Sequence, residues 1–416
     1  MKSSYKRIGD YIELVDERNK ELNVDLLLGL SISKQFIPSV ANTVGADMSN
    51  YKIIKKGQFA CSIMQVRRDG KMPIALLQDF DEAIISQAYP VFRVIDENKL
   101  LPEYLMMWFS RSEFDRQATF HAVGGVRGSL EWDDFLDFEL PIPSIEKQQE
   151  IVTEYNTITN RIALNEKLNQ KLEETAQAVY KHWFVDFEFP DNDGKPYKSS
   201  GGKMIYNEEL DDEIPEGWQL GTLDFLSSQF SGFSFKGDKY SYSDGVTVVR
   251  GENITEKRLR WDTHKKWDLE LDDRMKKCFL KPNDIVIGMD GSKVGKNWSL
   301  VSELELPLLL AQRVTSVRGN NGYESFFLYL SIDVLNFTEY VAQVQTGTSV
   351  PHISGQQIKD FPMVIPEQSN LIAFDSVVNP LFNQIYLNIN FSKKLEDLID
   401  LLLSKMTKVD EEIVQK

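Results

Sequence analysis

The chain has 416 residues, of which 42% are hydrophobic and 26% charged, values typical of a globular protein with two or three domains. Its net charge of −16 argues against a surface that binds nucleic acid all over, although local basic patches can still do so. The two distant cysteines, Cys61 and Cys278, give neither a disulfide framework nor zinc spacing, and no run of about 18 apolar residues predicts a membrane span.

The sequence contains an internal repeat. The heptapeptide D-F-E-L-P-I-P, from Asp137 to Pro143, recurs 223 residues later as D-F-P-M-V-I-P, from Asp360 to Pro366. The same offset continues without a gap through the segments that follow, and it drifts to 225 or 226 upstream. Chance agreement between two amphipathic helices is the alternative explanation, and the shared D-F-x-x-x-I-P motif argues against it.

The repeat predicts two mixed domains, each followed by a long helix. Short strand-like runs bounded by Gly and Pro alternate with short helical stretches, so we expect an α+β fold in both copies. Aromatic residues recur through the linker, which predicts an ordered, hairpin-like connection. The expected segments are a first domain at 1–143, a first helix at 144–185, the linker at 186–217, a second domain at 218–366 and a second helix at 367–416.

Both long segments carry the seam of a coiled coil. Mostly apolar residues alternate at spacings of four and three along the first helix, and the positions 223 residues later repeat the pattern. The first set is 151, 155, 158, 162, 165, 169, 172, 176, 179 and 183. One helix cannot bury such a seam alone, so we expect the two helices to pack antiparallel about a pseudo-two-fold axis. In the alternative, each helix packs on its own domain.

The seam becomes polar at the same two places in both copies, at Asn165 and Asn169 and at Asn388 and Ser392. Polar residues at seam positions fix the register and orientation of a coiled coil. Antiparallel helices related by a pseudo-two-fold axis would bring equivalent polar positions near their middles face to face.

The sequence contains no recognisable catalytic motif. A phosphate-binding loop, a nucleophile elbow and the tetrapeptide that amino-methyltransferases place against a flipped base are all missing. The four histidines are scattered, and none has metal-ligand spacing with a cysteine or another histidine. We therefore predict neither catalytic residues nor a metal site in this chain.

These features together resemble the specificity subunit of type I restriction–modification systems. The resemblance rests on the two helical segments introduced by D-F-x-x-x-I-P and on the linker W-F-V-D-F-E-F-P…D-G-K-P-Y-K-S-S-G-G…E-I-P-E-G-W, from Trp183 to Trp218. It covers essentially the whole chain and is weak inside the two mixed domains.

The resemblance implies that each mixed domain is a target-recognition domain that reads one half of a split double-stranded DNA target. The helices would act as a ruler for the unread spacer and would dock two methyltransferase (modification) subunits, which motor-nuclease (restriction) subunits join. This chain itself would be non-catalytic and bind no cofactor, because S-adenosylmethionine, ATP and Mg would belong to the partner subunits. The domains differ in sequence, so we expect an asymmetric target. We also expect a cytoplasmic protein without a signal peptide.

Aligned loops supply the candidate DNA-binding residues. Basic residues near glycines suit phosphates and base edges, Gln can pair with adenine, and Arg can pair with guanine. The set contains the aligned basic loops, the aligned Gln turns and a third pair of loops. It also draws on a stretch with 11 basic and 7 acidic residues between Lys257 and Lys296. The candidates are Arg67, Arg68, Lys71, Gln87, Arg127, Asn253, Lys257, Arg258, Lys293, Lys296, Gln312, Arg313, Thr348 and Ser349.

Three other interpretations remain open at this point. The chain could be a coiled-coil scaffold that presents two protein-binding domains, which the acidic net charge favours. It could serve a fused cleavage–methylation polypeptide instead of separate subunits. It could also be an enzyme whose site is assembled from dispersed residues, although no motif supports this.

Overall fold

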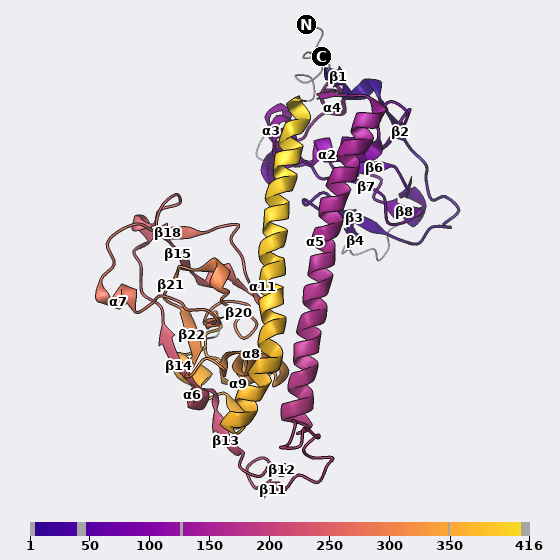
Figure 1. Cartoon of the computed structure of the whole chain (residues 1–416). Coiled ribbons are helices and arrows are strands. Elements are labelled where there is room, and N and C mark those ends of the chain that lie inside the picture. Colours follow the sequence, from indigo (N-terminus) through magenta and orange to yellow (C-terminus); the bar gives the residue numbers. More distant parts are fainter. Residues whose placement is uncertain (1–4, 40–46, 125–127, 348–349, 409–416) are drawn as a thin grey trace. The chain divides into compact units, whose positions relative to one another are not determined.

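The computed structural model describes residues 5–39, 47–124, 128–347 and 350–408 (Figure 1). The chain forms two compact units, of which the first is made of two separate segments of the sequence and the second of one continuous segment. Unit 1 comprises Met1–Ala163 and Ser392–Lys416, and unit 2 comprises Leu164–Phe391. Each unit therefore contains one globular part and a segment of both long helices, α5 (Ile145–Tyr180) and α11 (Gln368–Lys405).

Unit 1 is built around a four-stranded antiparallel sheet in the order β2-β9-β6-β7. Two strand pairs, β3-β4 and β5-β8, lie outside this sheet, and β1 pairs with β10 just before α5. Its strands are β1 (Tyr5–Arg7), β2 (Ile12–Val15), β3 (Leu28–Leu30), β4 (Phe36–Pro38), β5 (Lys52–Lys55), β6 (Phe59–Cys61), β7 (Ile74–Leu76), β8 (Glu82–Ile85), β9 (Val91–Val94) and β10 (Glu139–Pro141). Its short helices are α1 (Val66–Asp69), α2 (Pro102–Phe109), α3 (Ser112–His121) and α4 (Trp132–Leu136).

Unit 2 has a four-stranded sheet, β14-β22-β19-β20, a three-stranded sheet, β18-β15-β21, and three two-stranded pairs. Its strands are β11 (Met204–Asn207), β12 (Asp212–Pro215), β13 (Gln219–Thr222), β14 (Ser227–Ser231), β15 (Val246–Val249), β16 (Ile254–Thr255), β17 (Arg258–Leu259), β18 (Lys265–Trp267), β19 (Ile285–Gly288), β20 (Trp298–Leu300), β21 (Leu308–Leu310), β22 (Val314–Gly319) and β23 (Pro362–Ile365). Its short helices are α6 (Leu223–Leu226), α7 (Asp273–Lys276), α8 (Ser325–Val334), α9 (Phe337–Val344) and α10 (Gly355–Lys359).

The two units repeat one topology. The sheet order β2-β9-β6-β7 corresponds strand by strand to β14-β22-β19-β20, and the pair β1-β10 corresponds to β13-β23. Three short helices, α2–α4 in unit 1 and α8–α10 in unit 2, then lead to the strand that precedes each long helix. The α+β class predicted from the sequence repeat is therefore confirmed.

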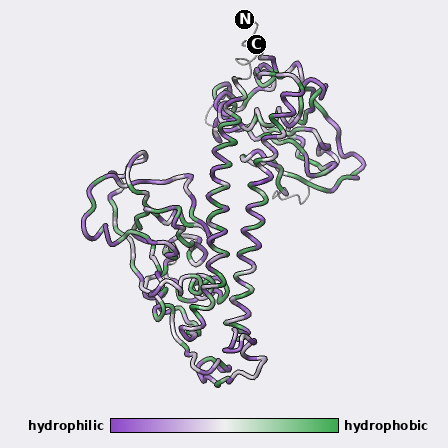
Figure 2. The backbone as a smooth tube through the Cα atoms, in the orientation of Figure 1, coloured by the Kyte–Doolittle hydropathy of each residue, from purple (hydrophilic) through white to green (hydrophobic). Residues whose placement is uncertain are grey.

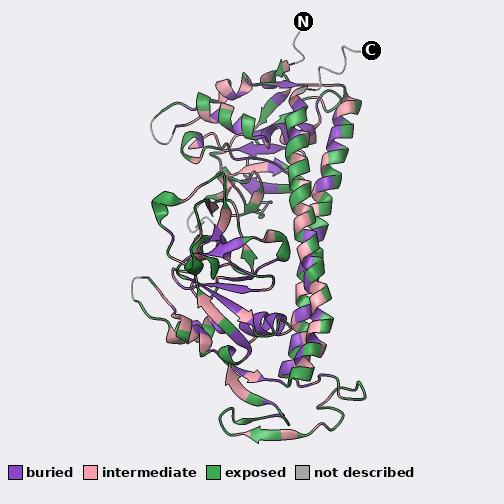
Figure 3. Ribbon diagram, turned by 60° about the vertical axis from the view of Figure 1, so that its left-hand side comes forward, coloured by how far each residue is buried: buried purple, intermediate pink, exposed green. Residues whose placement is uncertain are grey.

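The long helices form because their seams bury apolar side chains. Every predicted seam position of both helices is buried or half-buried, and the positions between them are mostly exposed (Figure 3). The same alternation of hydrophobic and hydrophilic residues runs along both helices in Figure 2. A helix with one apolar stripe is stable only when that stripe is covered, and here the other long helix and the adjoining domain cover it.

The two long helices run antiparallel. In unit 1, Ile151 near the start of α5 shares a core with Leu403 near the end of α11. In unit 2, Tyr180 at the end of α5 packs against Phe374 near the start of α11, with ring centroids 6.1 Å apart. The predicted antiparallel coiled coil is therefore confirmed, and the alternative of two separately packed helices is wrong.

The polar positions of the seam pair differently from the prediction. The sequence equivalent of Asn388 is Asn165, but the register of the two helices pairs Asn388 with Asn169, one helical turn away. The Nδ2 of Asn388 donates to Oδ1 of Asn169 at 2.8 Å, and both residues are 7% exposed. In an antiparallel pair the facing positions have residue numbers with a constant sum, so only a residue at the midpoint faces its own equivalent. Asn165 is also buried, within unit 2.

The linker is ordered by stacked aromatic rings. Phe189 lies between Tyr197 and Trp218, with ring centroids 4.5 and 4.8 Å apart, and it belongs to the main core of unit 2. The chain then forms the β11–β12 hairpin before it enters the second domain. The expected ordered, hairpin-like connection is confirmed.

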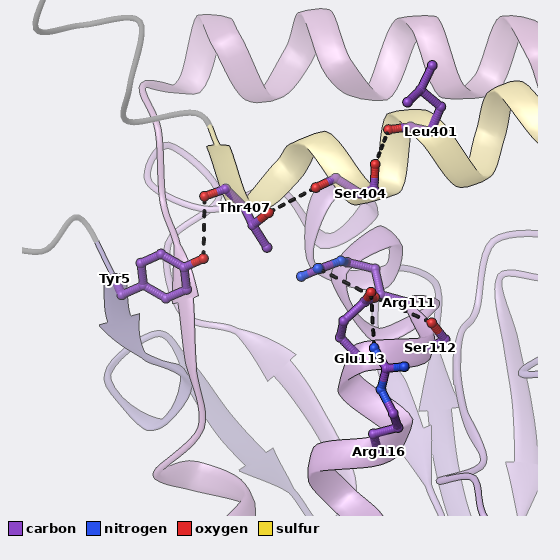
Figure 4. Close-up of polar contacts among 8 residues, drawn as sticks. All are labelled: Tyr5, Arg111, Ser112, Glu113, Arg116, Leu401, Ser404 and Thr407. Atoms are coloured by element: carbon purple, nitrogen blue, oxygen red, sulfur yellow. Dashed lines mark hydrogen bonds and ion pairs between the residues drawn. The ribbon is translucent and has the colours of Figure 1, made fainter.

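The first strand of unit 1 lies against the end of α11 (Figure 4). The Tyr5 hydroxyl donates to the backbone oxygen of Thr407 at 3.5 Å, and Thr407 Oγ1 donates to the backbone oxygen of Ser404 at 2.9 Å. Nearby, the buried guanidinium of Arg111 lies 4.2 Å above the ring of Trp108 and 3.5 Å from Glu113. Residues from both ends of the sequence therefore complete the same unit.

Candidate nucleic-acid interface

In unit 1, two loops predicted to face DNA are bonded to each other. The β6–β7 loop and the loop before α4 are joined by hydrogen bonds from Leu130 N to Ile63 O at 2.9 Å and from Arg67 N to Gly128 O at 3.1 Å. Because main-chain bonds connect them, their side chains are displayed from one continuous backbone surface.

Unit 2 repeats this pairing, with one bond at equivalent residues and a second bond that shares only its acceptor position. The β19–β20 loop and the loop before α10 are joined by bonds from Ile353 N to Met289 O at 2.9 Å and from Gly291 N to Pro351 O at 3.1 Å. The sequence alignment had placed these loops opposite those of unit 1. Each unit therefore brings the same two loops together, although their side chains differ.

The β6–β7 loop of unit 1 displays basic residues on a single helical turn. Helix α1 is bounded by Gln65 and Gly70, both with φ of 63°, so the chain turns sharply into and out of it. The guanidinium of Arg68 is engaged by the neighbouring carboxylate of Asp69 at 2.6 Å. The three predicted basic residues of this loop are all exposed, namely Arg67, Arg68 and Lys71.

The β19–β20 loop of unit 2 is fastened to α9. A Cβ at Gly295, whose φ is +80°, would lie 2.9 Å from Cβ of Val341, so only glycine allows this approach. The Thr338 hydroxyl donates to the backbone oxygen of Gly295 at 2.8 Å. The backbone of the loop that carries the exposed Lys293 and Lys296 is consequently held in place by α9. Within the described part of the chain, neither ammonium group makes an ion pair.

The predicted glutamines lie on equivalent turns. Gln87 is exposed between β8 and β9, and Gln312 is exposed between β21 and β22. Arg313 follows Gln312 with φ of 66°, and its backbone oxygen accepts a hydrogen bond from Met289 N at 3.0 Å. The turn of unit 2 therefore adjoins the β19–β20 loop directly.

Asp290 connects three segments of unit 2. Its carboxylate accepts a hydrogen bond from Arg313 Nη1 at 2.5 Å and another from His352 Nδ1. Burial by itself would raise the pKa of Asp290, but the bonds from Arg313 and His352 outweigh burial and lower that pKa. The carboxylate is thus held charged against a guanidinium whose side chain is 71% exposed.

Asn253 is a correction to the predicted set. The residue is 1% exposed, and its Nδ2 donates to the backbone oxygens of Arg260 and Thr263 at 3.2 and 2.8 Å. Its Oδ1 accepts a hydrogen bond from Arg250 N at 3.1 Å. Both amide hydrogens are used inside the fold, so Asn253 stabilises a turn and does not read DNA.

Lys257 and Arg258 lie close to α5. Lys257 Nζ is 2.9 Å from Asp333 Oδ2 on α8, and Gln177 of α5 donates to the same oxygen at 2.6 Å. Burial raises the pKa of Glu173, also on α5, while the charges of Lys257 and Arg258 oppose that rise. These two basic residues therefore lie close to acidic groups on α5 and α8.

Three predicted residues, Arg127, Thr348 and Ser349, lie outside the described residues. The segments that flank them are alike in the two units. Val123 bridges to Ser129 in unit 1, and Thr346 bridges to His352 in unit 2. Gly124 and Gly347 have φ of 99° and 90°, a region in which glycine is favoured.

The described residues hold no cluster of three or more His, Cys, Asp and Glu side chains that could bind a metal ion. Both cysteines are buried and unbridged, and burial raises the pKa of the Cys61 thiol, which disfavours the reactive thiolate. In the described ranges, every helix is too short or too polar to cross a bilayer.

Sequence reasoning did not include Asp290 or His352 among the candidate residues. The D-G dipeptide at Asp290 and Gly291 marks a turn, which was the available signal. No local pattern, however, indicated that the carboxylate would meet Arg313, 23 residues further along the chain.

Comparison with known proteins supplies further findings. The family described as "Type I restriction modification DNA specificity domain" matches residues 35–174. The chain is 26% identical over 315 residues to the MjaIX specificity subunit of Methanocaldococcus jannaschii, covering 75% of this chain and 70% of that protein. It is 22% identical over 405 residues to the HindI specificity subunit of Haemophilus influenzae, covering 85% and 86%.

The fold also matches a solved structure. The S subunit of a type I restriction–modification system from M. genitalium superimposes with a TM-score of 0.55 at 14% sequence identity, covering 97% of this chain and 95% of that one. At this identity the likeness concerns the fold alone, and it includes both domains and both long helices.

Proposed function

We propose that this chain, which belongs to the family of type I restriction–modification specificity subunits, reads a split DNA target with the paired loops of its two units. One observation carries the proposal. Each unit brings a strand loop and a helix loop together through main-chain bonds, of which Leu130 N to Ile63 O and Ile353 N to Met289 O are equivalent, while the side chains on these loops differ. Loop pairs that share a backbone arrangement but carry different side chains are suited to reading two different half-sites.

The charge distribution supports DNA as the ligand. The body is acidic, whereas the paired loops present exposed Arg67, Lys71, Lys293 and Lys296. Basic side chains on loops bind phosphates and set the position of a protein on the duplex, and neighbouring Gln and Arg side chains can read base edges. The exposed Gln87 and Gln312 occupy equivalent turns beside these loops. Because the side chains on the paired loops differ between the two units, the DNA target should be asymmetric.

The chain is the recognition subunit of such a system and not its catalytic one. Methylation and cleavage then require partners that carry S-adenosylmethionine, ATP and Mg, and this division of labour is part of the proposal. We assign the partners as two modification subunits, which restriction subunits join.

Two equivalent apolar positions support two copies of one partner. Leu164 on α5 and Leu387 on α11 are related by the repeat offset and are 54% and 56% exposed. Leu168, one turn further along α5, is 43% exposed. Exposed leucines at matching places on two related helices are suited to two identical docking contacts.

Methylome mapping tests the proposed function. The chain would be co-expressed with its modification subunit in a host without this methylation, and methylated bases would be mapped across the genome. We expect methylation at a single split, asymmetric sequence that depends on this chain. Methylation that is absent, or unchanged without this chain, would contradict the proposal.

A further inference from the structure

We propose that Asp290 is a positioning residue that orients the guanidinium of Arg313 to read a guanine in the half-site bound by unit 2. His352 assists by holding the second carboxylate oxygen of Asp290. The inference rests on the proposed function. It adds that the base read is guanine, that Arg313 reads it, and that Asp290 and His352 act through Arg313.

The exposure of the three side chains increases from Asp290 to His352 to Arg313, as expected if Asp290 holds Arg313 in place. The side chain of Asp290 is 17% exposed, that of His352 is 42% exposed and that of Arg313 is 71% exposed. The anchor therefore lies within the fold while the group that would contact DNA reaches solvent. Arg313 Nη1 lies 2.5 Å from Asp290 Oδ2, and His352 Nδ1 donates to Oδ1.

The backbone fixes the same three segments. Met289 N donates to Arg313 O at 3.0 Å, and Asp290 and His352 are paired as an antiparallel bridge. Arg313 itself has φ of 66°, a left-handed conformation that is uncommon outside glycine. Such conformations persist where the surroundings impose them, and they concentrate at functional sites. Both ends of the Asp290–Arg313 contact are consequently held by main chain as well as by side chain.

The chemistry of guanidinium explains why the carboxylate matters. One nitrogen of the planar Arg313 group, Nη1, is bound to Asp290, which restrains the orientation of the group and leaves its other N–H donors available. Two such donors match O6 and N7 of guanine in the major groove. A side chain already held in this orientation loses less conformational freedom on binding than a free arginine does.

Unit 1 lacks the device at the equivalent positions. When the repeats are aligned by their matching backbone bonds, Met64 is equivalent to Asp290 and Ser129 to His352. In the aligned turn, Ala88 is equivalent to Arg313. A surface arginine that merely kept the protein soluble would need no half-buried carboxylate partner. We therefore expect this guanine in only one of the two half-sites.

Selection from a pool of random DNA duplexes tests the inference. The full-length chain, in complex with its modification subunit, would select duplexes, and sequencing would give the base preference at each position. The variants are Asp290→Asn, which keeps the shape of the side chain, and Arg313→Lys, which keeps the charge. Glu13→Gln is the control, because it weakens the Arg93–Glu13 pair (2.7 Å) on the strands of unit 1.

We expect both variants to lose preference for guanine at one and the same position. The expected loss is roughly 5- to 150-fold, which corresponds to the discrimination of one bidentate Arg–guanine contact. All other positions, and the Glu13→Gln profile, should match the wild type. Rescue of the guanine preference by Asp290→Glu, with a longer carboxylate, would further support a positioning role.

Two results would overturn the inference. Asp290→Asn and Arg313→Lys could give the wild-type preference at every position, or they could weaken all positions equally, which is the mark of a purely structural role. If the wild-type complex itself enriches no split sequence, the proposed function fails and the inference fails with it. Thermal melting of each complex shows whether a variant remains folded.

Discussion

Asn388 Nδ2 donates a hydrogen bond to Asn169 Oδ1 at 2.8 Å inside the otherwise mostly apolar seam of α5 and α11. Both residues are nearly buried, so each amide depends on the other for part of its hydrogen bonding. A buried polar pair of this kind opposes any shift of one helix along the other, because a shift would leave two amides without partners.

Replacement of one member should therefore destabilise the helix pair. Asn388→Leu leaves the Asn169 amide without this partner, and we expect the free energy of unfolding to fall by about 1–3 kcal/mol. Urea unfolding followed by circular dichroism measures this change. Asn383→Leu is the control, because Asn383 is exposed on the same helix. An equal effect of both changes would contradict a specific role for the pair.

The double change Asn169→Leu with Asn388→Leu should recover most of that stability, since two apolar side chains then face each other. Register and partner choice should instead become less specific, which size-exclusion chromatography with light scattering can detect as additional oligomers. A double variant that is as unstable as the single one, or that keeps one oligomeric state and the wild-type target, would argue against a register function. The double change Asn165→Leu with Asn388→Leu tests the same function at the two positions related by the sequence repeat.

The lysines of the β19–β20 loop should contribute to DNA affinity through phosphates. We expect Lys293→Ala and Lys296→Ala to weaken binding to all sequences similarly and to lower the slope of log K against log salt by about 1 each. Filter binding across a salt series measures both quantities. Lys281→Ala is the matched control, because Lys281 is exposed at the opposite end of β19. Unchanged affinity and slope would remove the loop from the interface.

The two exposed leucines should control the number of modification subunits bound. Leu164→Asp and Leu387→Asp each place a charge in one proposed docking contact, and we expect each to weaken one contact at least tenfold, or about 1.4 kcal/mol. Native mass spectrometry should then show one modification subunit with each single variant and none with the double variant. Leu401→Asp, at a residue that is 49% exposed, is the control. Two bound subunits in the double variant would rule out these positions.

Glu173 should make unit 2 less stable as pH rises. Burial raises the pKa of this carboxyl above its ordinary value, so the fold favours the neutral form. Its stabilising contribution is present below the unfolded pKa of about 4.3 and is lost as pH rises through the higher folded pKa. We therefore expect Glu173→Gln to unfold at a higher urea concentration than the wild type at pH 7, with the difference vanishing near pH 4.

Glu174→Gln provides the control for that measurement. A hydrogen bond from Lys171 lowers the pKa of the neighbouring Glu174, so its replacement should not stabilise the protein at pH 7. If Glu173→Gln and Glu174→Gln behave alike at pH 7, burial of Glu173 has no consequence for stability.

The long helices could be predicted from sequence because their pattern is local. Spacings of four and three residues identify a seam regardless of what covers it, and the repeat identified the most plausible cover. The aligned loops were also predictable, because Arg67 and Lys293 follow equivalent strands. The pairing of Asn388 with Asn169 was not, since it depends on the register between helices.

The remaining features depend on contacts between residues far apart in sequence. Asn253 resembled an exposed polar residue in a basic stretch, but backbone oxygens at Arg260 and Thr263 close around it only in the folded turn. Asp290 and His352 are brought together across 62 positions by a strand-like bridge. Composition and spacing carry no information about such long-range contacts, which form only when the sheet and its loops fold together.

The participation of the last turns of α11 in unit 1 has a consequence for how the protein is made. Leu403 and Met406 belong to the same apolar core as Phe59 and Ile151, and the Tyr5 hydroxyl bonds to Thr407. The first domain to leave the ribosome therefore lacks part of its interior until the last turns of α11 have been synthesised. A nascent chain must keep that surface covered by other means until then, and termination shortly before residue 403 would leave unit 1 incomplete although every residue of unit 2 had been made.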